Sequence, residues 1–204
     1  MDEALIEELD YEIDLLIKSG FFSEDEIFEI IEDEFIDEEL DLDLSLHIGK
    51  RFAELTEGLK TGEDFLNLSD AFRNLSQENI ICIHNAGFDI EEGIQDSFEL
   101  YTHILNNKLE VEGFCFYSFE DIETAIYENK LNIAFGDFEL DESKALEIGK
   151  TIADCLRENG FDIIWEETVD EQIVIEDFEW KKAFDDKEYS MDGAFEDYVA
   201  VHKE

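Results

Sequence analysis

The first sixty residues carry apolar side chains at helical spacing, separated by acidic ones. In residues 4–22 the apolar positions recur every three or four residues, at Leu5, Leu9, Ile13 and Leu16. This period predicts an amphipathic helix. Gly20 follows the stripe, in the position where a left-handed glycine commonly ends a helix. We therefore expect the first helix to end near Gly20.

The sequence SEDE at residues 23–26 predicts the start of a second helix. The Ser23 hydroxyl can accept a hydrogen bond from the backbone N–H of Glu26, and the Glu26 carboxylate can accept one from the backbone N–H of Ser23. This arrangement is a capping box. Apolar residues then follow at helical spacing, at Ile27, Ile31 and Phe35.

Residues 40–59 fit two structures. Strand-like alternation is present at Leu40, Leu42, Leu44 and Leu46. Helical spacing is present at Leu44, Ile48, Phe52, Leu55 and Leu59. Because the helical pattern is the longer one, we predict a helix here. The sequence of residues 61–79 predicts a further helix.

From Asn79 onward the period of the apolar residues changes. Five short segments are rich in β-branched and aromatic residues: IICIH (80–84), GFCFY (113–117), LNIAFG (131–136), FDIIWE (161–166) and QIVIEDF (172–178). Such segments are typical of strands. The first four alternate with helical segments, whereas the last two lie close together. We therefore predict a mixed sheet of about five strands covered by helices.

Two of the helices between these strands show a clear apolar stripe. The stripe of the first is Ile94, Phe98, Tyr101 and Leu105, and that of the third is Ala145, Ile148, Ile152 and Leu156. Gly160 is the stop signal of the third helix. With the helices that precede the sheet, the pattern predicts an α+β fold, or an α/β fold.

No linker rich in Gly and Ser marks a domain boundary, so the division of the chain rests on composition. Residues 1–46 contain nineteen acids and one lysine, while the strand-bearing part is less extreme. We divide the chain into an acidic helical segment (1–60), a sheet domain (61–182) and an acidic C-terminal tail (183–204).

The charge of the chain restricts its partners. There are 58 Asp and Glu against 14 Lys and Arg, for a formal net charge of -44, yet 44% of the residues are hydrophobic and 18 are Phe. Such a chain has enough apolar residues to fold. Its field repels nucleic acid and anionic lipid and attracts basic protein surfaces. We expect a basic protein partner, diffuse weak binding of cations, and neither direct nucleic-acid binding nor membrane binding.

The first residues of the sequence and the three cysteines indicate a reducing compartment. The acidic start lacks the basic and apolar regions of a signal peptide, and no apolar run reaches the roughly 20 residues that span a bilayer. Cys82, Cys115 and Cys155 are odd in number and set among apolar neighbours, which favours reduced core thiols. We expect a cytoplasmic protein.

The stretch around His84 is the best candidate for a chemical site. His84 closes a predicted strand, and Asn85, Asp89 and Tyr117 are its candidate companions. The pairs of His and Cys that typify metal sites are absent, as are glycine-rich phosphate loops, so we expect no metal ion and no cofactor. The alternative is structural: HNAGF is a turn in which Asn85 or Gly87 is left-handed, Cys82 faces inward, and His103 pairs with Glu99 four residues earlier.

The motifs NAGF, GFCFY and the final IVIEDFEW, in this order, resemble a family of uncharacterised bacterial proteins known as a domain of unknown function. In that family an Asn-Ala-Gly-aromatic turn and a Gly-aromatic-Cys-aromatic-Tyr strand recur. The resemblance spans about residues 5–182. It implies a folded domain and carries no established activity.

These observations favour a non-catalytic acidic interaction protein that binds a basic protein, such as a toxin-neutralising immunity protein or an inhibitor. The acids expected to project toward the partner are Glu7, Glu8, Asp14, Glu29, Glu32 and Asp33. Two alternatives stay open. One is a regulator that mimics the charge of nucleic acid, and the other is an enzyme with a site near His84 and Asn85.

Overall fold

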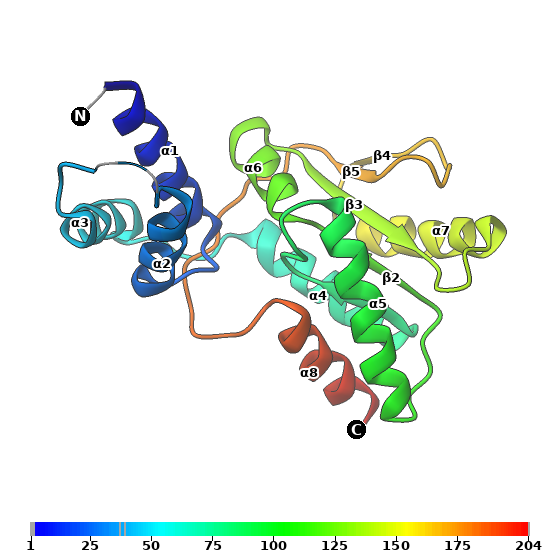
Figure 1. Cartoon of the computed structure of the whole chain (residues 1–204). Coiled ribbons are helices and arrows are strands. Elements are labelled where there is room, and N and C mark those ends of the chain that lie inside the picture. The colour runs from blue at the N-terminus through cyan, green and yellow to red at the C-terminus, as the bar shows by residue number, and fades with distance from the viewer. Residues whose placement is uncertain (1–2, 37, 39, 204) are drawn as a thin grey trace. The chain divides into compact units, whose positions relative to one another are not determined.

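The computed structural model describes residues 3–36, 38 and 40–203, which form eight helices and a five-stranded sheet (Figure 1). The chain divides into two compact units. Unit 1 consists of Met1–Gly62 and Lys181–Asp186, and unit 2 consists of Glu63–Trp180 and Lys187–Glu204. The prediction of helices followed by a helix-covered mixed sheet is confirmed.

Unit 1 is built from three helices: α1 (Glu3–Ser19), α2 (Glu24–Glu34) and α3 (Leu44–Thr56). Gly20 ends the first with a φ of +74°, and Ser23 and Glu26 form the predicted capping box of the second. Asp43 caps α3 by accepting from the backbone N–H of Leu46. The helix predicted over the ambiguous leucines therefore begins at Leu44, and the strand-like alternation before it forms no strand in the described residues.

The segment Lys181–Asp186 completes unit 1 from the other end of the chain. The backbone N–H of Gly62 donates to the carbonyl of Lys181 at 2.9 Å, and the ring of Phe184 packs edge-on against Phe52. The side chain of Lys182 is buried. A stretch that the sequence places at the junction of sheet domain and tail thus belongs to the helical unit.

Unit 2 contains the sheet and five helices. In chain order its elements are α4 (Glu63–Gln77), β1 (Ile80–Ile83), α5 (Ile90–Asn106), β2 (Gly113–Phe116), α6 (Phe119–Glu128), β3 (Leu131–Gly136), α7 (Glu142–Glu158), β4 (Ile163–Ile164), β5 (Ile173–Ile175) and α8 (Met191–His202). The strand order is β1-β2-β3-β5-β4. Strands β1 and β2 are parallel, and the other neighbours are antiparallel.

Helix α5 covers one face of the sheet, and its buried residues are offset by one position from the predicted stripe, of which Phe98 and Tyr101 are partly buried against the core. Ile94 and Leu105 are 40% and 46% exposed, whereas Gly93 and Ser97 are buried. The reason is the aromatic strand β2. A Cβ atom at Gly93 would lie 2.2 Å from the ring of Phe116. The large ring therefore packs against the side of the helix that carries the small residues Gly93 and Ser97. The apolar stripe predicted for α7 is correct, since its four residues are all buried.

Helix α8 was not predicted. It contacts β1, α4 and α5, and its residues Ala194 and Tyr198 are buried (Figure 1). The Tyr198 hydroxyl donates to the carbonyl oxygen of Glu110 at 2.6 Å. Because β1 is an edge strand, a helix beside it protects the open side of the sheet. Among the described residues, no helix is both long and apolar enough to cross a membrane.

Candidate functional site

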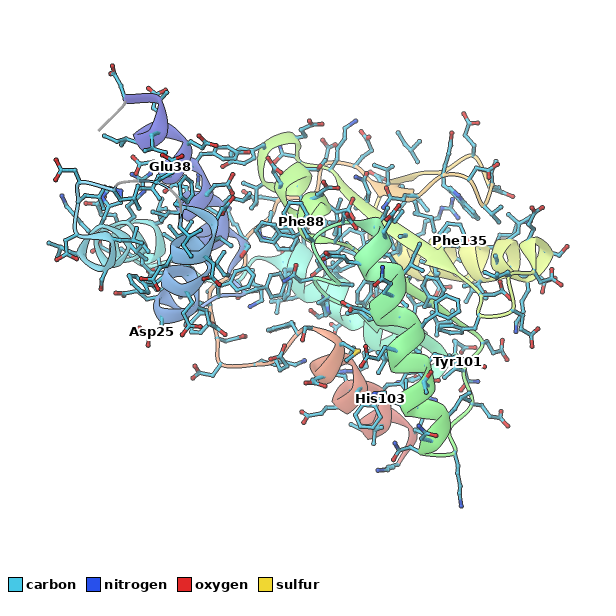
Figure 2. All side chains as sticks on the ribbon, viewed as in Figure 1. Asp25, Glu38, Phe88, Tyr101, His103 and Phe135 are labelled. Atoms are coloured by element: carbon cyan, nitrogen blue, oxygen red, sulfur yellow. The ribbon has the colours of Figure 1, made fainter. Side chains whose placement is uncertain are left out.

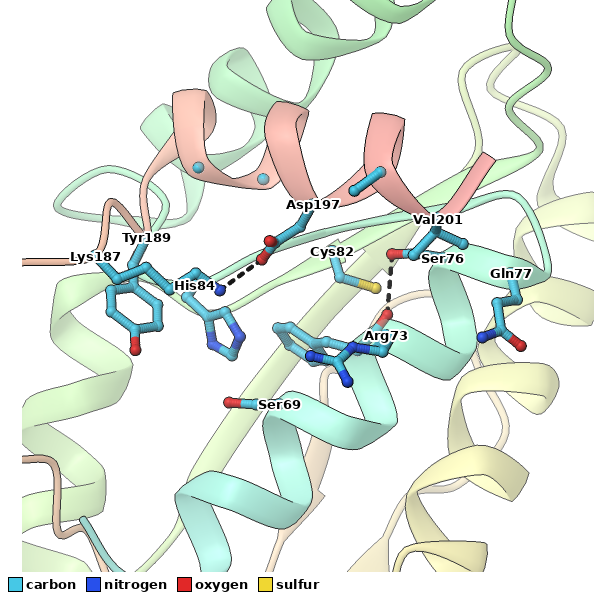
Figure 3. A pocket seen from close by; sticks show the side chains of 14 residues that line it. Ser69, Arg73, Ser76, Gln77, Cys82, His84, Lys187, Tyr189, Asp197 and Val201 are labelled. Atoms are coloured by element: carbon cyan, nitrogen blue, oxygen red, sulfur yellow. Dashed lines mark hydrogen bonds and ion pairs between the residues drawn. The ribbon is translucent and has the colours of Figure 1, made fainter. Parts of the chain in front are cut away.

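A cavity of about 390 Å³ lies in unit 2 (Figure 3). Its wall is formed by α4, by the end of β1, by the segment that precedes α8 and by α8 itself. Its polar side chains include Ser69, Arg73, Gln77, His84, Lys187 and Asp197. This volume is within the range of small-molecule sites. The cavity is therefore the place where the chemistry of the predicted site residues can be judged.

His84 and Tyr117 are brought together by the register of the parallel strands. Ile83 is opposite Phe116, so the next residue of each strand is also adjacent. The Nδ1 atom of His84 lies 2.8 Å from the Tyr117 hydroxyl, and the imidazole ring lies 4.6 Å from the ring of Phe72. Burial raises the pKa of Tyr117, and the nearby Tyr189 adds to this effect. The two side chains thus form a buried hydrogen-bonded contact, and His84 is the member that lines the cavity.

Asn85 lies in the turn that the sequence predicts. Asn85 and Gly87 both have positive φ angles, of 55° and 62°. The backbone N–H of Ala86 donates to the carbonyl of Tyr117, and that of Phe119 donates to the carbonyl of Gly87. The turn is thus fixed by the segment that joins β2 to α6. The buried Oδ1 atom of Asn85 accepts no hydrogen bond from the described residues.

Asp89 has a different role from the one considered in the catalytic alternative. Its side-chain oxygen accepts from the backbone N–H groups of Glu91 and Glu92, at 2.8 and 3.0 Å. It is the N-cap of α5, where a carboxylate stabilises the helix end. Of the four candidate residues, the structure joins His84 to Tyr117, while Asn85 and Asp89 shape the turn and the helix after it.

His103 also lies apart from the cavity. It projects from α5 with half of its side chain exposed, and its Nε2 atom is 3.8 Å from Glu99 (Figure 2). This is the i,i+4 pair that the spacing predicts. Within the part of the chain that the structure describes, no three His, Cys, Asp or Glu side chains are placed to hold a metal ion.

Two thiols meet beside the cavity, and one of them, Cys82, lines it. Cys82 and Cys115 are directly opposite in the register of β1 and β2, and their sulfur atoms are 3.5 Å apart. Burial raises the pKa of the Cys82 thiol well above its usual value, and the hydrogen bond with Cys115 adds to this. Cys82 faces inward, as predicted, and is neutral at physiological pH. A neutral thiol is a weak nucleophile.

Two basic residues of the cavity were missed by the sequence reasoning. Arg73 lies on α4, and Lys187 lies in the segment that was set aside as tail. The Lys187 amine is 2.8 Å from a carboxylate oxygen of Asp197 and 5.1 Å from the ring centre of Tyr189. No local pattern marks either residue. The one signal in the sequence is the spacing of Arg73 and Gln77. They are four residues apart, which places both side chains on the same side of α4.

The acids predicted to meet a partner lie in unit 1, and all but one are exposed. Glu7 and Glu8 project from α1, and Glu29, Glu32 and Asp33 project from α2. Asp14 differs from the expectation. Its carboxylate binds Arg51 at 2.6 Å and also lies 3.6 Å from Lys18, and its side chain is only 20% exposed. Asp14 is therefore part of the packing between α1 and α3.

A further acid joins this group. Glu34 is exposed near the end of α2, and its pKa is raised by partial burial and then by the charge of Glu8. The carboxylates of Glu8 on α1 and Glu34 on α2 therefore repel one another. We call the exposed set the α1–α2 carboxylates: Glu7, Glu8, Glu29, Glu32, Asp33 and Glu34.

A family model for a domain of unknown function (DUF6891) matches residues 2–184. No curated protein and no solved structure matches the chain. The matched range includes α4 and β1 of the cavity wall. Lys187, Asp197 and the rest of the α8 wall lie beyond it.

Proposed function

The chain belongs to the DUF6891 family, whose description assigns no activity, and we propose that it is a non-catalytic binding protein for a basic protein partner. The surface that meets the partner is formed by the α1–α2 carboxylates. In the cell, such binding neutralises a basic protein, as an immunity protein or an inhibitor does.

The observation that carries this proposal is the repulsion between Glu8 and Glu34. Partial burial raises the pKa of Glu34, and the charge of Glu8 adds to this shift, so the free protein bears an electrostatic cost at this surface. A cationic side chain placed between the two helices would remove that cost. Long-range attraction would also steer the partner before contact and increase the association rate.

The residues at and around the predicted site favour binding over catalysis. Tyr117 is neutral and fully buried, Cys82 is a neutral thiol, and Asp89 is occupied as a helix cap. General acid–base catalysis needs a group with a pKa close to the working pH, and the pKa values of Tyr117 and Cys82 are shifted away from it. The enzyme alternative therefore gains no support from these residues.

The test compares two variants with the same change in net charge. The first carries Glu7→Gln, Glu8→Gln, Glu29→Gln, Glu32→Gln and Asp33→Asn. The matched control carries the same number of neutralised acids on exposed positions of unit 2: Glu147→Gln, Glu158→Gln, Glu166→Gln, Glu171→Gln and Asp170→Asn. Partners are first isolated from cells at low salt and eluted at high salt, and association rates with the purified partner are then measured for each variant.

We expect the first variant to associate at least about tenfold more slowly at low ionic strength, and the control to change by less than about threefold. The difference should shrink as salt is added, because salt screens long-range attraction. Equal slowing of both variants would show that the partner responds to net charge alone. If neither variant is slowed, the proposal is wrong.

A further inference from the structure

Arg73 has no ionic partner among the described residues, although the protein has a large excess of acids. The chain contains 58 acids and three arginines. Arg51 binds Asp10 and Asp14, and Arg157 binds Asp154. The guanidinium group of Arg73 makes no ion pair and no hydrogen bond with any described residue, although Asp70 lies one turn earlier on α4. Instead, Arg73 lines the cavity.

A second cation lies on the α8 side of the same cavity. Lys187 is oriented by its ion pair with Asp197, at 2.8 Å (Figure 3). Asp197 is the only carboxylate among the described residues that line the cavity. Its charge balances that of Lys187, so the charge of Arg73 makes the lining net positive. Exposed charges farther than about 10 Å are largely screened at 0.1 M salt, so a bound molecule responds most strongly to the charges at and near the cavity lining.

The wall between the two cations is aromatic. The ring of His84 lies 4.6 Å from that of Phe72 and 5.6 Å from that of Tyr189. The hydroxyl of Ser69 and the amide of Gln77 add hydrogen-bonding groups at the rim. Apolar and aromatic walls with a few polar groups are typical of sites for small organic molecules. A planar ring fits such a wall by stacking or by edge contacts.

We propose that this cavity binds a small organic anion with a planar ring. The ring lies against Phe72 and Tyr189, and the anionic group accepts charge-assisted hydrogen bonds from Arg73. A guanidinium group can bind a carboxylate or a phosphate through two parallel hydrogen bonds, and both groups present this chemistry. Lys187 supplies additional positive potential at the opposite side. This site is separate from the α1–α2 carboxylates and does not depend on the function proposed for them.

The probes are 1-naphthoate and 1-naphthyl phosphate, with the uncharged 1-naphthamide as the matched neutral ligand. Binding to the full chain is followed by amide chemical shifts in two-dimensional NMR and by changes in ligand fluorescence. We expect at least one anion to bind saturably, with shifts concentrated on α4, the end of β1 and α8. The neutral amide should bind at least about tenfold more weakly, because it forms no charge-assisted hydrogen bond with Arg73. The two anions distinguish a carboxylate site from a phosphate site.

Three variants separate this site from nonspecific adsorption. Arg73→Gln should weaken anion binding by about tenfold or more, since the charge-assisted hydrogen bonds are lost. Arg157→Gln removes the same charge from an exposed position of α7 and should change binding by less than about twofold. Ala200→Trp, at the cavity lining, should abolish binding by filling the space. Spectra of each free variant report whether its fold is intact.

Three results would overturn the proposal. One is that neither anion binds. Another is that Arg73→Gln behaves like Arg157→Gln. The last is that the anion and the neutral amide bind equally well.

Discussion

The amine of Lys182 donates a hydrogen bond to the backbone carbonyl of Gly20, 162 residues earlier in the chain, at 2.8 Å. The amine also lies 4.8 Å from the centre of the Phe21 ring and 3.4 Å from a carboxylate oxygen of Asp185. The side chain is 1% exposed. This contact fixes the returning segment to the end of α1 and stabilises unit 1.

Replacing Lys182 with Ala should therefore destabilise the protein. The Gly20 carbonyl would lose its charged donor in a buried position, which costs about 1–3 kcal/mol. Urea unfolding followed by circular dichroism measures this change. Lys60→Ala, an exposed lysine of the same unit, is the control and should stay within about 0.5 kcal/mol of the unchanged protein. A stability loss no larger than that of the control would show that the Lys182 contact is dispensable.

Gly93 should tolerate no larger side chain. A Cβ atom there would lie 2.2 Å from the ring of Phe116, a fully buried residue of β2. Gly93→Ala should cost about 1–3 kcal/mol of unfolding free energy, because an overpacked core has to shift. Gln95→Ala, exposed on the same helix, should have little effect. The double variant Gly93→Ala/Phe116→Leu should recover part of the loss relative to Phe116→Leu alone, and a purely additive loss would contradict this explanation.

Stability should increase as the pH falls from 7 toward about 5. The pKa of Glu34 is raised above its usual value of 4.5 by burial and Glu8, and that of Asp96 is raised above 3.8 by burial, Glu99 and Glu92. A carboxyl with a raised pKa binds its proton more tightly in the folded state. Its contribution to folding is thus gained as the pH falls through the raised pKa. Urea midpoints across this range test the sign, and Glu8→Gln should reduce the increase.

Sodium chloride should raise the melting temperature. A net charge of -44 opposes compaction, and only 14 basic residues are present to form ion pairs. Salt screens repulsion between exposed carboxylates within about 10 Å at 0.1 M, which favours the folded state. Thermal melts at 10 mM and 300 mM sodium chloride provide the comparison, and the increase should be absent near pH 4, where most of the repulsion is removed by protonation. A melting temperature that falls with salt at pH 7 would show that ion pairs outweigh repulsion.

The elements that the sequence predicted well are those encoded by neighbouring residues. The capping box of Ser23 and Glu26 and the buried stripe of α7 depend on spacings of three or four positions. The stripe of α5 was predicted one residue away from the buried positions, because the size of Phe116, on another element, decides which residues of the helix pack most closely. Helix α8 was missed since its aromatic residues do not form a clear stripe, and its position depends on the edge of β1.

In the candidate site, too, the sequence indicated the features that depend on neighbouring residues and missed those that depend on distant ones. His84 and Tyr117 could be selected from the sequence as strand-end residues, and the register of β1 and β2 then explains their contact. The role of Asp89 as a cap follows from its place before a helix. Arg73 and Lys187 could not be paired in advance, because they lie on segments separated by more than one hundred residues. Their common cavity exists only after the sheet and α8 have assembled.

The segment Lys181–Asp186 also has a consequence for protein synthesis. The helices α1, α2 and α3 leave the ribosome before the sheet, yet the segment that completes their unit follows every strand of the sheet. Domains commonly fold in the order in which they are made, N-terminal first. Here unit 1 is completed only by a segment that is made after the whole sheet. The nascent helices therefore leave the apolar surface that Lys181–Asp186 covers open to chaperones while the sheet is being synthesised.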